Sequence, residues 1–243
     1  VVHEGYSDTF LHPIRVTRHT DLASSTQRVF SAIGGILPYL VITFAYLGGF
    51  YPAIDLAAGE KERRTLETLL LTPVSRVDIA LGKFLVLFTT SLLAALLGIA
   101  SLTISLYFIV PATVMEQLNI QINPLAAFSV ALLALPPAAI FAGLFLSISI
   151  YARSFKEAQN YMAPLGIIVI LPAAAAMIPG VELTWKSALI PFVNLSLLAR
   201  EFLKGDIDWF FYSLTLSSSI FLAIVFLLLS VWQFQRESVL FRS

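Results

Sequence analysis

The sequence from Gly59 to Arg76 reads GEKERRTLETLLLTPVSR and lies between two long apolar runs, at about residues 29–56 and 84–110. A charged side chain at the centre of a bilayer costs about 3 kcal/mol even on the scale derived from translocon insertion. We therefore expect this charged stretch to lie in water or at a membrane surface. The apolar runs on either side of it are predicted to cross the membrane.

Composition supports a membrane protein. Hydrophobic residues make up 58% of the 243 residues and charged residues only 12%, with a mean hydropathy of +0.87, far from the usage of soluble domains. The chain has no cysteine, which excludes disulfides, thiolate metal sites and a cysteine nucleophile. Its formal net charge of zero argues against a nucleic-acid partner.

Five uncharged runs are long enough to cross a hydrocarbon core, which takes about 20 helical residues. The strict alternation of apolar and polar residues that marks a transmembrane β-strand is absent, so the runs are predicted to be helices. The expected fold is an all-α membrane protein, a polytopic bundle of about five transmembrane helices. The predicted spans are residues 29–56, 84–110, 124–152, 160–179 and 209–232.

Orientation is predicted from basic residues, which concentrate in cytoplasmic loops. The loops after the first and third spans and the C-terminal tail carry them, so these three segments are expected on the cytoplasmic side. The connections near residues 111–123 and 180–208 are expected on the other side, together with residues 1–28. The basic residues that decide this are Lys61, Arg63, Arg64, Arg76, Lys83, Arg153, Lys156, Arg236 and Arg242.

The charged stretch is predicted to form a short amphipathic helix. Leu66, Leu69 and Leu70 recur at helical spacing on one side. On the polar side, Glu60 can pair with Arg64, and Arg63 with Glu67, because each pair is four residues apart.

Signals after this helix predict a bend. Thr72 precedes Pro73, and a residue before proline is pushed out of helical geometry. Ser75 then offers a cap, with Asp78 three residues later, for a second helix that leads into the next span. Charged residues beside a span can also be simple anchors in solvent, so the residues alone leave that reading open.

The order of residues in this stretch resembles a known family. Acidic and basic pairs, the TLE core, TP and the downstream Gly82-Lys83 closely resemble the cytoplasmic loop of type-2 ABC exporter permeases, particularly the NatB-like sodium-efflux branch. In that family the loop is the coupling helix, about residues 59–76 here, which contacts the ATPase subunit. The resemblance implies a coupling role for Glu60, Lys61, Glu62, Arg63, Arg64, Thr65, Leu66, Glu67, Leu69, Leu70, Thr72, Pro73 and Arg76. The apolar stripe would seat in a groove on the ATPase.

The same resemblance implies the partners. The chain would act with an ABC ATPase subunit and a second permease copy or a related permease, as a multi-pass protein of the cell inner (plasma) membrane. A P-loop requires glycine where Val77 stands and Ser or Thr where Phe84 stands. The chain itself is therefore expected to be no enzyme and to hold no cofactor, with ATP and Mg on the partner subunit.

The resemblance covers nearly the whole chain but departs from the family at the front. Residues 181–208 look like the short outer-leaflet helices that these permeases carry before their last span. Family members have six core spans and a sizeable external domain, whereas residues 1–28 here would be a remnant of that domain. The chain is thus expected to be the C-terminal part of a longer subunit, with residues 29–243 as the permease domain.

The positions of the histidines argue against two classes of intramembrane protease. His3, His12 and His19 all precede the first span, so intramembrane metalloproteases and serine proteases lack their histidines. The remaining alternative is a secondary transporter, channel or membrane scaffold that works without ATP. Such transporters usually bury an ionisable residue at mid-membrane, and no predicted span has a central charge.

The sequence does not distinguish between a sodium ion and a hydrophobic or peptide-like molecule as the transported cargo. A sodium path would use oxygens at broken helices, although such hydroxyls commonly bond to their own helix instead, and a hydrophobic or peptide-like cargo fits equally well. Ala139 and Gly143 are spaced for close helix packing, in the bundle or at a dimer seam. Candidate oxygens for a sodium path are those of Thr43, Tyr46, Ser101 and Thr103 and the carbonyls near Pro38, Pro136 and Pro137.

Overall fold

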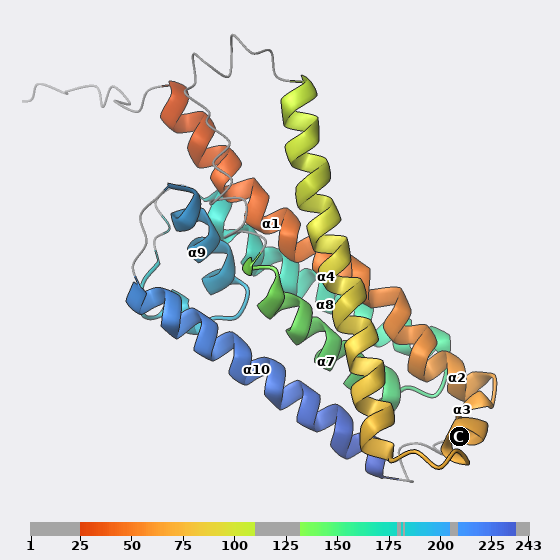
Figure 1. Ribbon diagram of the computed structural model, residues 1–243. Coiled ribbons are helices and arrows are strands. Elements are labelled where there is room, and N and C mark those ends of the chain that lie inside the picture. Colours follow the sequence, from red (N-terminus) through yellow and green to blue (C-terminus); the bar gives the residue numbers. More distant parts are fainter. Residues whose placement is uncertain (1–24, 110–131, 179–180, 182, 205–208, 237–243) are drawn as a thin grey trace, which may run out of the picture.

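The computed structural model describes residues 25–109, 132–178, 181, 183–204 and 209–236 (Figure 1). Within these ranges the chain is built of helices and turns, without strands. The predicted all-α class is therefore confirmed. Of the predicted outer segment 1–28, residues 1–24 lie outside the described residues, and residues 25–28 belong to the first turn of a helix that starts at Ser25. The predicted outer connection at residues 111–123 and the tail beyond Arg236 also lie outside the described residues.

Each predicted span overlaps one long helix. Four of these helices are long and apolar enough to cross a membrane, and α7, with 17 residues, is shorter. The apolar composition of the helices thus supports a multi-pass membrane protein. The helices are α1 (Ser25–Ala53), α4 (Arg76–Ile109), α7 (Leu135–Tyr151), α8 (Phe155–Ala173) and α10 (Trp209–Gln235).

Three helices begin earlier than the apolar runs. α1 starts at Ser25 rather than near residue 29. α4 starts at Arg76 rather than near residue 84, so Asp78 and Lys83 belong to the first turns of the helix. α8 starts at Phe155 rather than near residue 160. Uncharged runs mark the part of a helix that faces lipid, whereas the helices themselves extend into the polar region, where charged side chains are tolerated.

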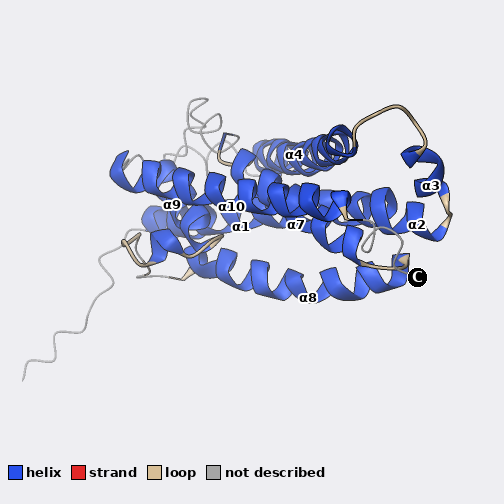
Figure 2. Ribbon diagram, turned by 90° about the horizontal axis from the view of Figure 1, so that it is seen from below, coloured by secondary structure: helices blue, strands red, loops and turns tan. Residues whose placement is uncertain are grey.

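α7 is the central helix of the bundle. Figure 2 shows α4 and α8 on opposite sides of it. Tyr46 of α1 stacks edge-on against Phe141 and Phe145 of α7, with ring centroids 5.6 and 5.1 Å apart, and its hydroxyl donates to the carbonyl of Met162 on α8 at 2.8 Å. This single side chain joins three helices at the core.

Small residues allow the helices to approach closely, as predicted for Gly143. A Cβ at Gly143 would lie 2.8 Å from the Cβ of Phe226 and 3.0 Å from the backbone N of Leu227. The close contact is therefore between α7 and α10 of the same chain, and it does not require a dimer seam. Gly48 likewise allows α1 and α4 to approach closely, because a Cβ at Gly48 would lie 2.4 Å from the Cβ of Ala94.

The predicted outer segment, residues 181–208, is helical in part. The helix α9 (Val193–Lys204) lies at the opposite end of the bundle from α3 (Thr65–Leu70) (Figure 1). Buried Asn194 donates to the carbonyl of Ala188 and to the hydroxyl of Ser218, both at 3.1 Å. These bonds fix the start of α9 against α10.

Candidate functional site

The candidate site is the link between α1 and α4, which we call the connecting segment (residues 54–75). It consists of a π-helix η2 (Ile54–Gly59), the single turn α2 (Glu60–Glu62), the short helix α3 and a turn. The amphipathic helix predicted to run up to the stop at Thr72-Pro73 is not continuous, because Arg64 has φ 60° and ψ 16°. A residue in this left-handed conformation cannot continue a right-handed helix, so it separates α2 from α3.

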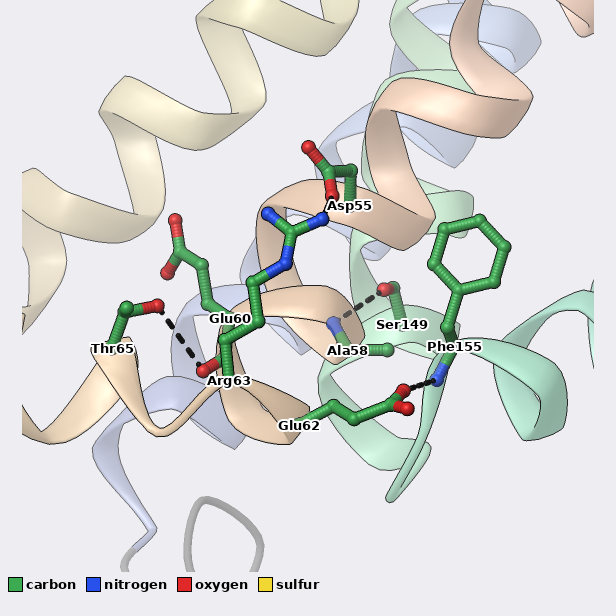
Figure 3. A network of polar contacts seen from close by, with 8 residues as sticks. All are labelled: Asp55, Ala58, Glu60, Glu62, Arg63, Thr65, Ser149 and Phe155. Atoms are coloured by element: carbon green, nitrogen blue, oxygen red, sulfur yellow. Dashed lines mark hydrogen bonds and ion pairs between the residues drawn. The ribbon is translucent and has the colours of Figure 1, made fainter.

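The π-helix is fastened to α7. Pro52, which has no N–H, lies just before it. The Ala58 N–H donates to the Ser149 hydroxyl at 3.1 Å in a buried position (Figure 3). Sequence reasoning did not select Ser149 or the π-helix, and Pro52 was the available signal for an irregular turn. Such π-bulges are frequent at functional sites.

The charged residues of α2 bind the ends of the α7–α8 hairpin. The Lys61 ammonium donates to the backbone carbonyls of Ile150 and, at 3.2 Å, Ala152, where α7 ends. The Glu62 carboxylate accepts the backbone N–H of Phe155, the first residue of α8, at 2.8 Å (Figure 3). Two neighbouring residues of α2 thus hold two neighbouring helix ends.

Two predicted ion pairs have other partners. Glu60 pairs with Lys83 of α4 at 2.5 Å rather than with Arg64. Arg63 pairs with Asp55 of the π-helix at 2.8 Å rather than with Glu67 (Figure 3). The four-residue spacing failed as a guide because the helix breaks at Arg64, so residues on its two sides do not share one helical face.

The apolar stripe of α3 faces the protein's own core. Leu66 is only 4% exposed, and Leu69 and Leu70 are half-buried against the core. The expectation that these three leucines seat in a partner is therefore corrected for Leu66, which has no free surface here. Leu71 and Val74, 87% and 51% exposed, are the apolar side chains that the connecting segment presents outward.

The end of α3 and the start of α4 follow the prediction. The Thr72 hydroxyl donates to the Leu69 carbonyl at 2.6 Å, just before Pro73. The Ser75 hydroxyl accepts the Asp78 backbone N–H at 3.1 Å, which caps α4 as expected. Thr65 closes the break at Arg64 by donating its hydroxyl to the Glu60 carbonyl at 3.3 Å (Figure 3).

Arg76 connects the segment to the last helix. Its guanidinium donates to the carbonyl of Gln235, the final residue of α10, at 3.2 Å. Together with the contacts of Lys61 and Glu62, this places the three predicted basic segments at one end of the bundle. That arrangement agrees with the topology predicted from their Lys and Arg residues.

Three of the candidate sodium oxygens, the hydroxyls of Thr43, Tyr46 and Thr103, are engaged within the chain. The hydroxyls of Thr43 and Thr103 donate to carbonyls of their own helices, at 2.9 and 2.8 Å, and that of Tyr46 reaches α8. Ser101 is exposed on the surface of α4. Among the described residues, no group of three or more His, Asp or Glu side chains gathers to hold a metal ion.

Comparisons with known proteins relate the sequence of the chain to transporters. Residues 9–239 match the family described as ABC-2 family transporter protein. The chain is 33% identical over 189 residues to the ABC transporter permease protein NatB of Bacillus subtilis (strain 168), covering 72% of this chain and 46% of that protein. The chain thus spans about half the length of this curated relative. No solved structure gave a significant match.

Proposed function

This chain belongs to the ABC-2 family of transporter proteins, and from that membership we propose that it forms the membrane-spanning permease of an ATP-driven exporter. A separate ABC ATPase, which carries ATP and Mg, supplies the energy. The connecting segment receives the movement of that ATPase and passes it to the helices. The complex contains a second permease, identical or related, and lies in the cell inner membrane.

The observation that carries this proposal is the apolar ridge formed by Leu71 and Val74. Both side chains are exposed on the connecting segment, among the exposed charges of Arg63, Arg64 and Glu67. An apolar pair within a charged, water-facing loop is typical of a docking surface with a polar rim. Burying a leucine that is fully exposed contributes roughly 1.5–3 kcal/mol, enough to make Leu71 the main apolar contact with an ATPase.

The docking proposal is tested by co-purification with a candidate ABC ATPase. Leu71→Asp is expected to weaken the complex by about tenfold or more, because it would bury a charge in the apolar centre of the interface. Leu71→Met is the control, since it keeps an apolar side chain of similar volume. Full binding by Leu71→Asp would refute docking at this ridge.

Folding must be separated from docking in that experiment. Leu66→Asp places a charge at a buried position, so it is expected to destabilise the permease itself and to lower its thermal unfolding temperature. Leu71→Asp is expected to leave the unfolding temperature unchanged, because the side chain is in water in the isolated chain. A variant that binds poorly while folding normally identifies the docking surface.

For the cargo we propose Na⁺, on the strength of the resemblance to NatB-like permeases. The proposal is tested in proteoliposomes that contain the permease and its ATPase, by following ATP-dependent movement of ²²Na⁺. ATP-dependent transport supports the proposal, whereas equal transport without the ATPase favours the ATP-independent alternative. Absence of sodium movement under ATP hydrolysis would refute this cargo.

An apolar cargo is the second candidate because of one feature. An apolar hollow of about 460 Å³ lies between α1 and α8, lined by Tyr46, Phe50 and Tyr51 among others. Its walls expose almost no polar atoms, which suits a hydrophobic molecule better than an ion. Efflux of a fluorescent hydrophobic dye from the same proteoliposomes distinguishes this cargo from sodium.

A further inference from the structure

We propose that Lys61 and Glu62 lock the connecting segment and the α7–α8 hairpin into one rigid unit, so that movement of the segment carries both helices with it. The rigid unit is a property of the permease alone. Its consequence for transport rests on the function proposed above. Lys61 and Glu62 are positioning residues in this scheme, since they act through the helix ends that they hold.

The end of α7 is suited to a cation. The last carbonyls of a helix have no partner within the helix, and they carry the negative end of its dipole. The Lys61 ammonium donates to two carbonyls there, those of Ile150 and Ala152. Because a lysine ammonium has three donors and bears a full charge, both bonds are charge-assisted and stronger than neutral ones.

The beginning of α8 is suited to an anion. The first N–H groups of a helix also lack partners, and they form the positive end of the dipole. The Glu62 carboxylate accepts the first of them, from Phe155, at 2.8 Å. Ser154 satisfies another by accepting the Glu157 N–H at 3.2 Å. Glu62 therefore completes a cap that the hairpin's own residues leave open.

The order of the two charges matters. Lys61 and Glu62 are neighbours in the chain, and only residues 152–154 separate α7 from α8. One turn of helix thus sets a positive charge on the negative helix end and a negative charge on the positive one. Exchanging the two residues would place each charge at the end that repels it, with no change in net charge.

The position of α2 makes this lock a transmission point. α2 follows directly on the π-helix, which is itself bonded to α7 through Ser149, and the left-handed turn at Arg64 leads on to α3. A force applied to α3 reaches the hairpin through α2. Loss of the lock would leave α3 able to dock while α7 and α8 no longer follow.

Distances between spin labels test the rigid unit in the permease alone. The chain has no native cysteine, so labels can be placed at Thr68→Cys on α3 and Lys156→Cys on α8, both exposed positions. The labelled chain is expected to give a single sharp distance by double electron–electron resonance. The added exchange Lys61→Glu with Glu62→Lys is expected to abolish the sharp distance and give a broad distribution.

Matched variants make this result specific. Glu67→Gln removes an exposed charge on α3 and is expected to leave the sharp distance intact, and Lys61→Arg is expected to preserve it by donating to the same carbonyls. Circular dichroism and size-exclusion profiles establish that the exchanged variant keeps its helices and stays monodisperse. A sharp, unshifted distance in the exchanged variant would overturn the proposal.

The transport consequence is tested with the ATPase complex. In complexes of the exchanged variant with the ATPase, the ²²Na⁺ or dye moved per ATP that the ATPase hydrolyses is expected to fall by about fivefold or more relative to the native chain, the size of a typical coupling factor. Undiminished transport per ATP would overturn transmission through the lock. Failure of the native chain to bind any ATPase would instead refute the proposed function. The distances between the spin labels would still show whether the connecting segment and the hairpin form a rigid unit.

Discussion

The ammonium of Lys83 lies 2.5 Å from the carboxylate of Glu60 and also contacts the backbone carbonyl of Leu56. Lys83 is about two turns inside α4, whereas Glu60 begins α2 and Leu56 lies in the π-helix. Only 7% of the lysine side chain and 24% of the glutamate side chain are exposed. The ion pair therefore joins α4 to α2, and the contact with the Leu56 carbonyl joins α4 to the π-helix that follows α1.

Removing one member of the pair should destabilise the chain. Lys83→Met leaves the Glu60 carboxylate without its cation, and breaking a buried pair costs about 3–5 kcal/mol, less here because Glu60 keeps some contact with water. The apparent thermal unfolding temperature in detergent is expected to fall by several degrees. The double variant Lys83→Met with Glu60→Leu should recover most of the loss, and no recovery would contradict this account.

Two serines of α7 should differ in importance. Ser149→Ala removes the hydroxyl that accepts the buried Ala58 N–H and ties the π-helix to α7, and such a hydrogen bond contributes about 0.5–1.5 kcal/mol. Ser147→Ala removes only a hydroxyl that donates to the Gly143 and Phe226 carbonyls, a smaller loss. Thermal unfolding of the two variants should therefore rank Ser149→Ala as the less stable. Equal stabilities would show that the π-helix does not depend on Ser149.

Substitution of alanine for glycine should have opposite effects on stability at Gly48 and Gly82. A Cβ at Gly48 would lie 2.4 Å from the Cβ of Ala94 and 2.8 Å from the Thr90 carbonyl, so Gly48→Ala must push α1 away from α4. Nothing lies within 4 Å of a Cβ at Gly82, and alanine is favoured over glycine in a helix by about 1 kcal/mol. Gly48→Ala is expected to lower the unfolding temperature and Gly82→Ala to raise it. A stabilising Gly48→Ala would contradict the packing of α1 on α4.

The left-handed turn should be strained at Arg64. A non-glycine residue in this conformation costs roughly 1–2 kcal/mol, while glycine adopts it freely but is more flexible in the unfolded chain. Arg64→Gly is expected to raise the stability by up to about 1 kcal/mol, measured by thermal unfolding. Arg63→Gly is the control, because Arg63 has φ −82° and should gain nothing. Loss of stability in Arg64→Gly would mean that the guanidinium itself is needed.

The sequence was sufficient to predict the class of fold and the place of the long helices. Uncharged runs of membrane length have few alternatives to helix, because lipid offers backbone groups no partner. The cap at Ser75 and the stop near Pro73 were also predicted correctly, since both depend on neighbouring residues alone. Such local rules do not need knowledge of the tertiary structure.

The internal geometry of the connecting segment was not predictable in the same way. The π-helix and the break at Arg64 are stabilised by Ser149, Lys83 and Phe155, which lie on three other helices. The spacing of Leu66, Leu69 and Leu70 correctly indicated one apolar face. It could not show whether that face meets a partner or the chain's own core.

The left-handed backbone at Arg64 separates two parts of the connecting segment that are under different structural constraints. Residues before it must match the termini of α7 and α8, so few substitutions there leave the bundle intact. Of the residues after it, Leu66, Leu69 and Leu70 pack on the core. The others meet mostly solvent and, under the proposed function, are free to vary to suit a particular ATPase. Under the proposed function, the surface that meets the ATPase could therefore change by substitution at a few positions, without rebuilding of the membrane domain.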